Sequence, residues 1–199
     1  MAVTVDDALE IANKIGYPVM VRSVLCIGRG MEVVHDDEAM TFYMRAAVGV
    51  TPDRPILIDR FLHHATECEA DAISDGENVF VPAVMEHIEL AGIHSGDSAC
   101  ILPSRNLTKD QVETIRDYTS RIAKEMHVVG LMNMQYAIED GEVYVLEANP
   151  RASRTVPLVS KVCNIKMVKL ATDIMTSYLT GRPSPVPALK EKKIPHYGV

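Results

Sequence analysis

The chain has 199 residues, enough for one substantial hydrophobic core with a small additional lobe. Its net charge of −7 and its lack of basic runs argue against nonspecific nucleic-acid binding. With 47% apolar residues and a mean hydropathy of +0.04, it is typical of a soluble globular protein. No apolar run approaches the ~18 residues of a membrane span. The scattered cysteines disfavour a disulfide framework or zinc site and indicate a cytoplasmic setting: Cys26, Cys68, Cys100 and Cys163.

A first lobe is predicted within residues 1–60. Thr4 and Asp7 form a capping pattern that starts a helix, and Gly16 ends this helix. Short strands are expected at 19–21, 31–34 and 56–58. A second helix begins near Asp36 and has a buried stripe of Met40, Tyr43, Met44 and Ala47.

A second, larger lobe is predicted within residues 61–181. Its first strand alternates acids with small apolar residues, so Glu67, Glu69 and Asp71 share one face. A turn at Asp75-Gly76 leads into one long strand, 79–88. Thr108 and Gln111 form a capping box for the longest helix, whose inner face is predicted to hold Val112, Ile115, Ile122 and Met126.

The end of this lobe is predicted as a hairpin followed by two helices. Strands at 130–138 and 143–149 flank Asp140-Gly141, and helices follow near 156–162 and 166–180, where Gly181 is the stop. Residues 182–199 are rich in proline without periodicity and are expected to be a linker to a missing downstream domain. Together these elements predict an α+β fold that is truncated at both ends.

The strongest candidate for chemistry is the end of the last strand. Alternation places Glu147 and Asn149 on one face, and magnesium prefers oxygen ligands of this kind. Arg151 and Arg154 follow at once and could pair with phosphate or carboxylate oxygens. The alternative is a polar strand end with a surface salt bridge.

Gln135 on the partner strand makes this hypothesis sharper. A two-residue loop at Asp140-Gly141 would pair Gln135 with Leu146, on the face opposite Glu147. A three-residue loop, 139–141, would pair it with Val145, on the same face as Glu147. A role for Gln135 as metal ligand therefore requires a bulge at the turn.

Other polar segments carry weaker signals. The loop 92–98 could bind phosphate or ribose, or could be a plain turn. Arg22 with the loop 28–30 is similar to a flexible phosphate cover, although a lone GxG segment is common. Glu67 could reach a ribose hydroxyl or lie on a solvated sheet face. His87, beside Glu86 and Glu89, fits a structural role as well as a catalytic one.

Several segments together resemble the large subunit of carbamoyl-phosphate synthase, over nearly the whole chain. They are Gly16 to Arg22 (GYPVMVR), Met85 to Glu89 (MEHIE), Gly92 to Ala99, Gly130 to Gln135 (GLMNMQ) and Glu147 to Lys161 (EANPRASRTVPLVSK). The last segment is highly specific. It resembles the second ATP-grasp half, which phosphorylates carbamate, because the first half usually differs strongly there.

This resemblance implies an ATP-grasp fold with a lid lobe (1–60), a larger nucleotide- and metal-binding lobe (61–181) and the linker (182–199). It implies ATP contacts at Arg22, Arg60, Leu62, Glu67, Gly92, Ile93, His94, Ser95, Gln135 and Glu147. Magnesium or manganese would be held by Gln135, Glu147 and Asn149. Arg151 and Arg154 would lie near the transferring phosphoryl group, which suits a reaction that needs positioning and charge neutralisation.

The implied reaction is carbamate plus MgATP giving carbamoyl phosphate and MgADP, in cytoplasmic arginine and pyrimidine biosynthesis, with glutamine or ammonia as the nitrogen source. The implied partners are the rest of the large subunit and a glutaminase small subunit, with no nucleic acid and no membrane. Surfaces that these partners would cover predict self-association of the chain alone.

The segment 22–31 departs from the family's usual RPSYVLGGRGM, because one residue, the proline and one glycine are missing. Since glycine allows close backbone approach, we expect a lid that closes poorly on phosphates. Two alternatives follow: a folded but inactive ATP-grasp fragment, or another ATP-grasp ligase such as a biotin-dependent carboxylase component.

Overall fold

The computed structural model describes residues 1–23, 31–50, 55–93 and 97–199. The glycine loop at 28–30 and most of the divergent segment 22–31 lie outside these residues. The described chain forms two compact units, Met1–Leu62 and His63–Val199. Within these ranges, we find no helix with the length and apolarity that crossing a membrane requires.

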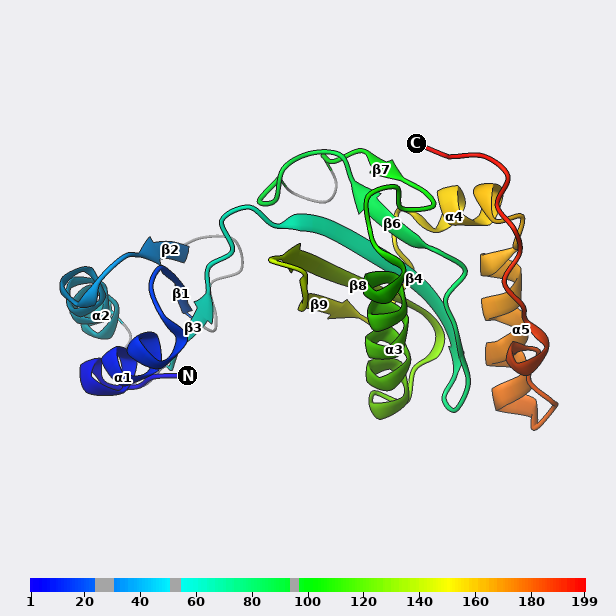
Figure 1. The fold of residues 1–199 in the computed structure, drawn as a ribbon. Coiled ribbons are helices and arrows are strands. Elements are labelled where there is room, and N and C mark those ends of the chain that lie inside the picture. The colour runs from blue at the N-terminus through cyan, green and yellow to red at the C-terminus, as the bar shows by residue number, and fades with distance from the viewer. Residues whose placement is uncertain (24–30, 51–54, 94–96) are drawn as a thin grey trace. The chain divides into compact units, whose positions relative to one another are not determined.

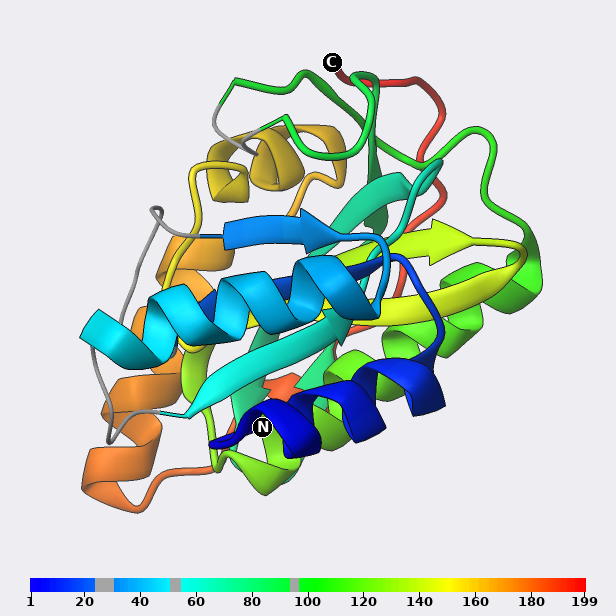
Figure 2. The same ribbon diagram turned by 90° about the vertical axis from the view of Figure 1, so that its left-hand side faces the viewer.

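The first unit is a three-stranded antiparallel sheet with two helices. Its elements are α1 (Val5–Ile15), β1 (Val19–Ser23), β2 (Met31–Val34), α2 (Asp37–Val50) and β3 (Ile56–Arg60), with strand order β2-β1-β3. Figure 2 shows α1 and α2 on one face of this sheet. The predicted capping box of Thr4 and Asp7 is confirmed. Met40 and Met44 are fully buried in the core between helices and sheet, as the stripe predicts.

The second unit is built on the long strand β4 (Thr66–Asp75). The sheet order is β7-β6-β4-β8-β9, and β5 also pairs with β4. The other strands are β5 (Val79–Phe80), β6 (Val84–His87), β7 (Cys100–Ile101), β8 (Val129–Glu139) and β9 (Glu142–Asn149). The helices are α3 (Lys109–Glu125), α4 (Val156–Val162), α5 (Met167–Thr180) and the 3-10 turn η1 (Val186–Ala188).

Two hydrophobic clusters cover the two faces of β4. Cys68, Ala70 and Ala72 pack with residues of α3 in one cluster, whereas Ile73 packs with α4 and α5 in the other. Figure 1 shows α3 and α5 on opposite sides of β4 accordingly. Because side chains alternate along a strand, the acids at 67, 69 and 71 lie on the same face as Ile73. They precede Ile73 on β4, and Ile73 is the residue of this face that packs with α4 and α5.

The predictions of one long strand at 79–88 and of a buried Met126 were wrong. The strand expected at 79–88 is interrupted at 81–83, where Pro82 has no amide hydrogen for the ladder, and β5 and β6 pair with β4 in registers that differ by one residue. Met126, expected in the core, is 45% exposed because α3 ends at Glu125 and Met126 is its C-cap. The capping box of Thr108 and Gln111 and the burial of Ile115 are confirmed.

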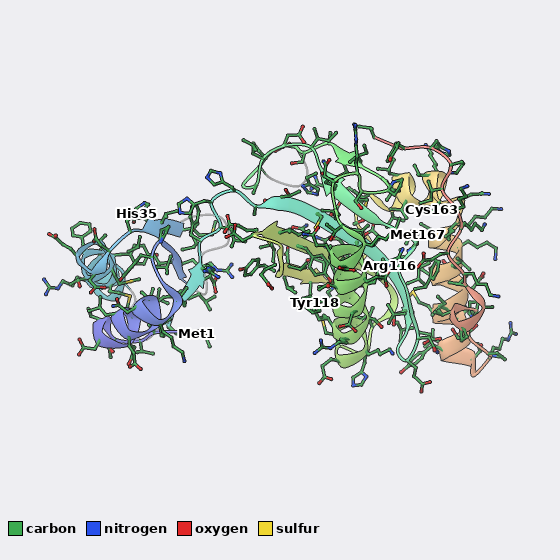
Figure 3. The ribbon with its side chains drawn as sticks, viewed as in Figure 1. Met1, His35, Arg116, Tyr118, Cys163 and Met167 are labelled. Carbon is green, nitrogen blue, oxygen red and sulfur yellow. The ribbon has the colours of Figure 1, made fainter. Side chains whose placement is uncertain are left out.

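The tail 182–199, expected to be a linker, packs against the second unit. Val186 is 3% exposed in the core, and Leu102 forms a β-bridge with Gly198. Arg116 of α3, labelled in Figure 3, pairs with Glu191 at 2.5 Å. Spaced apolar residues among prolines therefore dock on a surface that sequence periodicity does not reveal.

Tyr136 ties β8 to α3 from a fully buried position. Its hydroxyl lies 2.7 Å from Thr119 Oγ1 and donates to the carbonyl of Ile115 at 3.3 Å. This contact fixes the strand at the residue that follows Gln135.

We predict that Tyr136→Phe lowers the free energy of unfolding by about 1 kcal/mol, since the Ile115 carbonyl and the Thr119 hydroxyl lose a buried partner. Urea denaturation with an unchanged m-value would measure this loss. Tyr178→Phe, at a 67% exposed tyrosine of α5, is the control and should change stability little. Equal effects in the two variants would contradict the assignment.

Candidate active site

A cavity of about 420 Å³ opens over the acidic face of β4 in the second unit. Three strands supply its floor and the segment after β9 supplies a wall. The residues that line it are Glu67, Glu69, Gly92, Ile93, Asn133, Gln135, Leu146, Glu147, Arg151, Ser153, Arg154 and Thr155. Seven of the predicted site residues thus meet here, from segments as far apart as 67 and 154.

Gln135 and Glu147 lie directly opposite each other in the β8–β9 ladder. The connecting turn has two residues, with positive φ at Asp140 (52°) and Gly141 (86°), so the predicted three-residue turn was wrong. The extra residue is Leu146 instead, because the register shifts between Gln135 and Tyr136. A bulge in mid-strand therefore places Gln135 on the face of Glu147.

The same register extends to the end of the strand, where Asn133 is opposite Asn149. Alternation places both on the face that carries Gln135 and Glu147. Asn149 Nδ2 is buried and has no hydrogen-bond partner among the described residues. The two ends of an amide are assigned from their contacts, so this unsatisfied end can equally present an oxygen.

One carboxylate and two amides on neighbouring strand positions are a set of hard oxygen donors. Magnesium and manganese favour such oxygen ligands, with waters or phosphate oxygens completing the shell. Gln135 and Glu147 line the cavity, and Asn149 lies two residues beyond Glu147 on the same face of β9, with one end of its amide unsatisfied. These three oxygen donors fit a divalent cation.

Glu67 is held in place at the opposite side of the cavity. Its Oε1 accepts a 2.8 Å hydrogen bond from the Gly92 amide, and its Oε2 lies 3.5 Å from His87 Nδ1. The contact with His87 is the largest cause that lowers the pKa of Glu67. The carboxylate therefore stays charged and also fixes the start of the loop that contains Ile93.

His87 is a buried imidazole among acids. It is 5% exposed, and its Nε2 lies 4.0 Å from Glu69 Oε1. Burial disfavours its charged form, but Cys100, Glu67 and Glu69 favour it more strongly and raise the pKa of His87 to about 10. Of the two roles left open by the sequence, this geometry favours charge compensation within the sheet.

Glu69 and Asp71 continue the acidic row but are buried, at 3% and 1% exposure. Burial raises the pKa of each carboxyl. Asn133 bridges them, donating to Glu69 Oε2 at 3.2 Å and to Asp71 Oδ1 at 3.0 Å. These acids were not among the predicted site residues, although the alternation that singled out Glu67 includes them.

The wall after β9 carries two exposed arginines. Arg151 folds back locally, with its amide on the Asn149 carbonyl (2.7 Å) and its Nη1 on the Ala152 carbonyl (3.0 Å). Arg154 lines the cavity between Ser153 and Thr155. Two guanidinium groups beside a set of oxygen ligands can pair with an anionic ligand such as a phosphate.

The remaining predicted residues are not brought to this cavity by the described structure. Arg22, Arg60 and Leu62 belong to the first unit, where Arg22 Nε lies 3.6 Å from Asp59 Oδ2. His94 and Ser95 lie outside the described residues. Asn149 is likewise not among the residues that line the cavity, and the roles of all the predicted site residues stay predictions.

A family model described as "Carbamoyl-phosphate synthase L chain, ATP binding domain" matches residues 1–179. The carbamoyl phosphate synthase large chain of Methanocorpusculum labreanum is 53% identical over 97% of this chain, which covers 18% of that protein. The "large chain, C-terminal section" of Methanocaldococcus jannaschii is 54% identical over 87% of this chain and 28% of its own length.

Two solved structures share the fold. The biotin carboxylase domain of a thermophilic 2-oxoglutarate carboxylase, bound to ADP, aligns with a TM-score of 0.65 and 22% identity, over 87% of this chain and 40% of that one. Pyruvate carboxylase of Rhizobium etli aligns with a TM-score of 0.63 and 23% identity, over 82% of this chain and 15% of that one. The chain thus spans under a third of the length of these curated relatives. The chain has an α+β ATP-grasp fold and belongs to the family of ATP-binding domains of the carbamoyl-phosphate synthase large chain.

Proposed function

We propose that the cavity binds ATP with magnesium or manganese and contributes to the phosphorylation of carbamate, giving carbamoyl phosphate. The observation that carries this proposal is the bulge at Leu146, which places Gln135 opposite Glu147. Both residues line the same cavity as Arg151 and Arg154. Oxygen ligands beside guanidinium groups are what a polyphosphate with its cation requires.

The roles of the chain's own groups follow from their positions. Glu67, held by Gly92 and kept charged beside His87, accepts a hydrogen bond from the nucleotide's ribose. Gln135, Glu147 and Asn149 hold the cation, which when bound neutralises charge on the phosphate oxygens. Arg151 and Arg154 hold the transferred phosphoryl group in line with the acceptor, and no protein nucleophile is needed.

We assign the chain to the second, carbamate-phosphorylating half of the large chain. The relative named as a C-terminal section supports this assignment, as does the segment 147–161. In that setting the partners are the rest of the large subunit and a glutaminase small subunit, in cytoplasmic arginine and pyrimidine biosynthesis. The family match disfavours a biotin-dependent carboxylase component, because likeness at 22–23% identity reflects the fold alone.

We predict that ATP raises the melting temperature in a magnesium-dependent manner and that Glu147→Ala abolishes the magnesium dependence. A ligand at a hundredfold excess over Kd stabilises by about 2.7 kcal/mol, which thermal denaturation detects readily. Glu142→Ala, on the same strand at the turn, is the matched control and should keep the full shift. If millimolar ATP does not change the melting temperature of the wild type, the proposed nucleotide site is contradicted and the chain is a folded module that does not bind ATP.

A second prediction concerns the reaction. The protein should form ATP from MgADP and carbamoyl phosphate, and Arg154→Ala should reduce this rate about a hundredfold or more, as loss of a charge-stabilising donor does in other enzymes. A coupled hexokinase assay measures ATP formation. Arg121→Ala, which removes an arginine paired on the exposed side of α3, should retain the activity. Activity with acetyl phosphate but not with carbamoyl phosphate would refute the proposed substrate.

A third prediction concerns pH. Because the pKa of His87 is raised from 6.5 to about 10 in the folded state, its proton stabilises the fold below pH 6.5. This contribution should fall progressively as pH rises from 6.5 to 10. Urea denaturation across that range should show a smaller pH slope in His87→Gln than in the wild type. The exposed His196→Gln is the control and should leave the slope unchanged.

A further inference from the structure

Asp71 is a buried carboxylate that reaches the arginine-bearing wall of the cavity. It is 1% exposed on β4, yet two of its partners come from residues more than eighty positions later in the chain. Ser153 Oγ donates to Oδ1 at 2.6 Å and Thr155 Oγ1 donates to Oδ2 at 2.7 Å. Hydrogen bonds to a carboxylate are short and strong, so both carboxylate oxygens hold this segment.

The hydrogen bond from Thr155 to Asp71 replaces the one that an N-cap residue usually makes within its own helix. Thr155 occupies the N-cap of α4, where a threonine hydroxyl usually accepts a backbone hydrogen bond, but it makes no such bond. Its φ and ψ of −83° and −14° are helical and not extended. The hydroxyl donates to Asp71 instead, and the helix begins without its usual cap.

Arg154 lies between the two residues that Asp71 holds. Ser153 and Thr155, on either side of it, are both bound to Asp71, and their hydroxyls lie 2.8 Å apart. Arg151 lies outside the bound pair and is held by its own turn. A change at Asp71 should therefore affect Arg154 more than Arg151.

The interior side of Asp71 is also fixed. Asn133 of β8 donates to Asp71 Oδ1 and to Glu69 Oε2. Residue 133 is two positions before Gln135 on the same face of the strand, and Asn149 is directly opposite it. The hydrogen bonds thus connect the wall that carries Arg154 to β8, the strand that carries the predicted metal ligand Gln135.

We propose that Asp71 is a positioning residue that, through Ser153 and Thr155, presents Arg154 to the phosphate groups of the bound nucleotide. This inference rests on the proposed function of the cavity. Asp71 itself does not touch the ligand in this scheme. Its effect on binding passes through the guanidinium of Arg154.

The test uses Thr155→Val, which keeps the shape of the side chain and removes the hydroxyl. The Asp71 carboxylate then still has hydrogen bonds from Ser153 and Asn133. Thr155→Ser keeps the hydroxyl and should restore the wild-type behaviour. Thr176→Val is the matched control, because the Thr176 hydroxyl donates to the Thr172 carbonyl within its own helix. Each variant is titrated calorimetrically with MgATP and with adenosine, and its stability is measured in parallel.

We expect Thr155→Val to weaken MgATP binding roughly tenfold while adenosine binding is unchanged, since only the phosphates contact Arg154. In an Arg154→Ala background the same substitution should have no further effect, because residues that act through one group are not additive. Equal weakening for MgATP and adenosine, or additive losses in the double variant, would overturn the inference.

A second readout separates this inference from the proposed function. Amide hydrogen exchange at 153–155 reports the order of the segment without any ligand. If the wild type binds no ATP, the proposed function fails, and with it the role of Asp71 toward a nucleotide. If the wild type binds ATP but Thr155→Val leaves both exchange and affinity unchanged, the proposed function stands and the positioning role is refuted. Faster exchange together with selective loss of MgATP affinity supports it.

Discussion

Burial of acidic side chains along one face of β4 is the constraint on which the rest of the second unit depends. A carboxylate removed from water must find charged or hydrogen-bonding partners, or it will be protonated. Glu67 has His87 and the Gly92 amide, Glu69 has Asn133, and Asp71 has Asn133 with two hydroxyls. These partners come from β6, β8 and the loops on both sides of the cavity. The partners that these acids require thus bring the strands and loops of the site together.

The site also depends on the register of the β8–β9 hairpin. The two-residue turn, continued regularly, would set Gln135 against Leu146 and divide the oxygen ligands between the faces of the sheet. The extra residue at Leu146 restores them to one face and leaves the turn intact. Bulges beside binding sites commonly re-aim a side chain in this way.

Local patterns in the sequence were sufficient for much of the fold. Both capping boxes, the acidic alternation of β4 and the stop at Gly181 follow from hydrogen bonding and backbone sterics within a few residues. Predictions that needed partners elsewhere in the chain fared worse. The packing of the tail depends on which surface the segment meets, and no local pattern records that. The break at Pro82 and the exposure of Met126 have local causes instead, since proline has no amide hydrogen for the ladder and Met126 is the C-cap of α3.

For the site, the sequence alone determined which oxygen ligands and arginines are candidates, because residue type sets what a side chain can bind, and alternation sets which neighbours share a face. Only the tertiary structure decided that Gln135 lies opposite Glu147, since the extra residue at Leu146 is a property of how the two strands pair. It also decided that Asp71 is buried against Ser153 and Thr155. Contacts between residues so far apart in the chain arise from packing of the whole unit, and their chemistry is visible only once that packing is known.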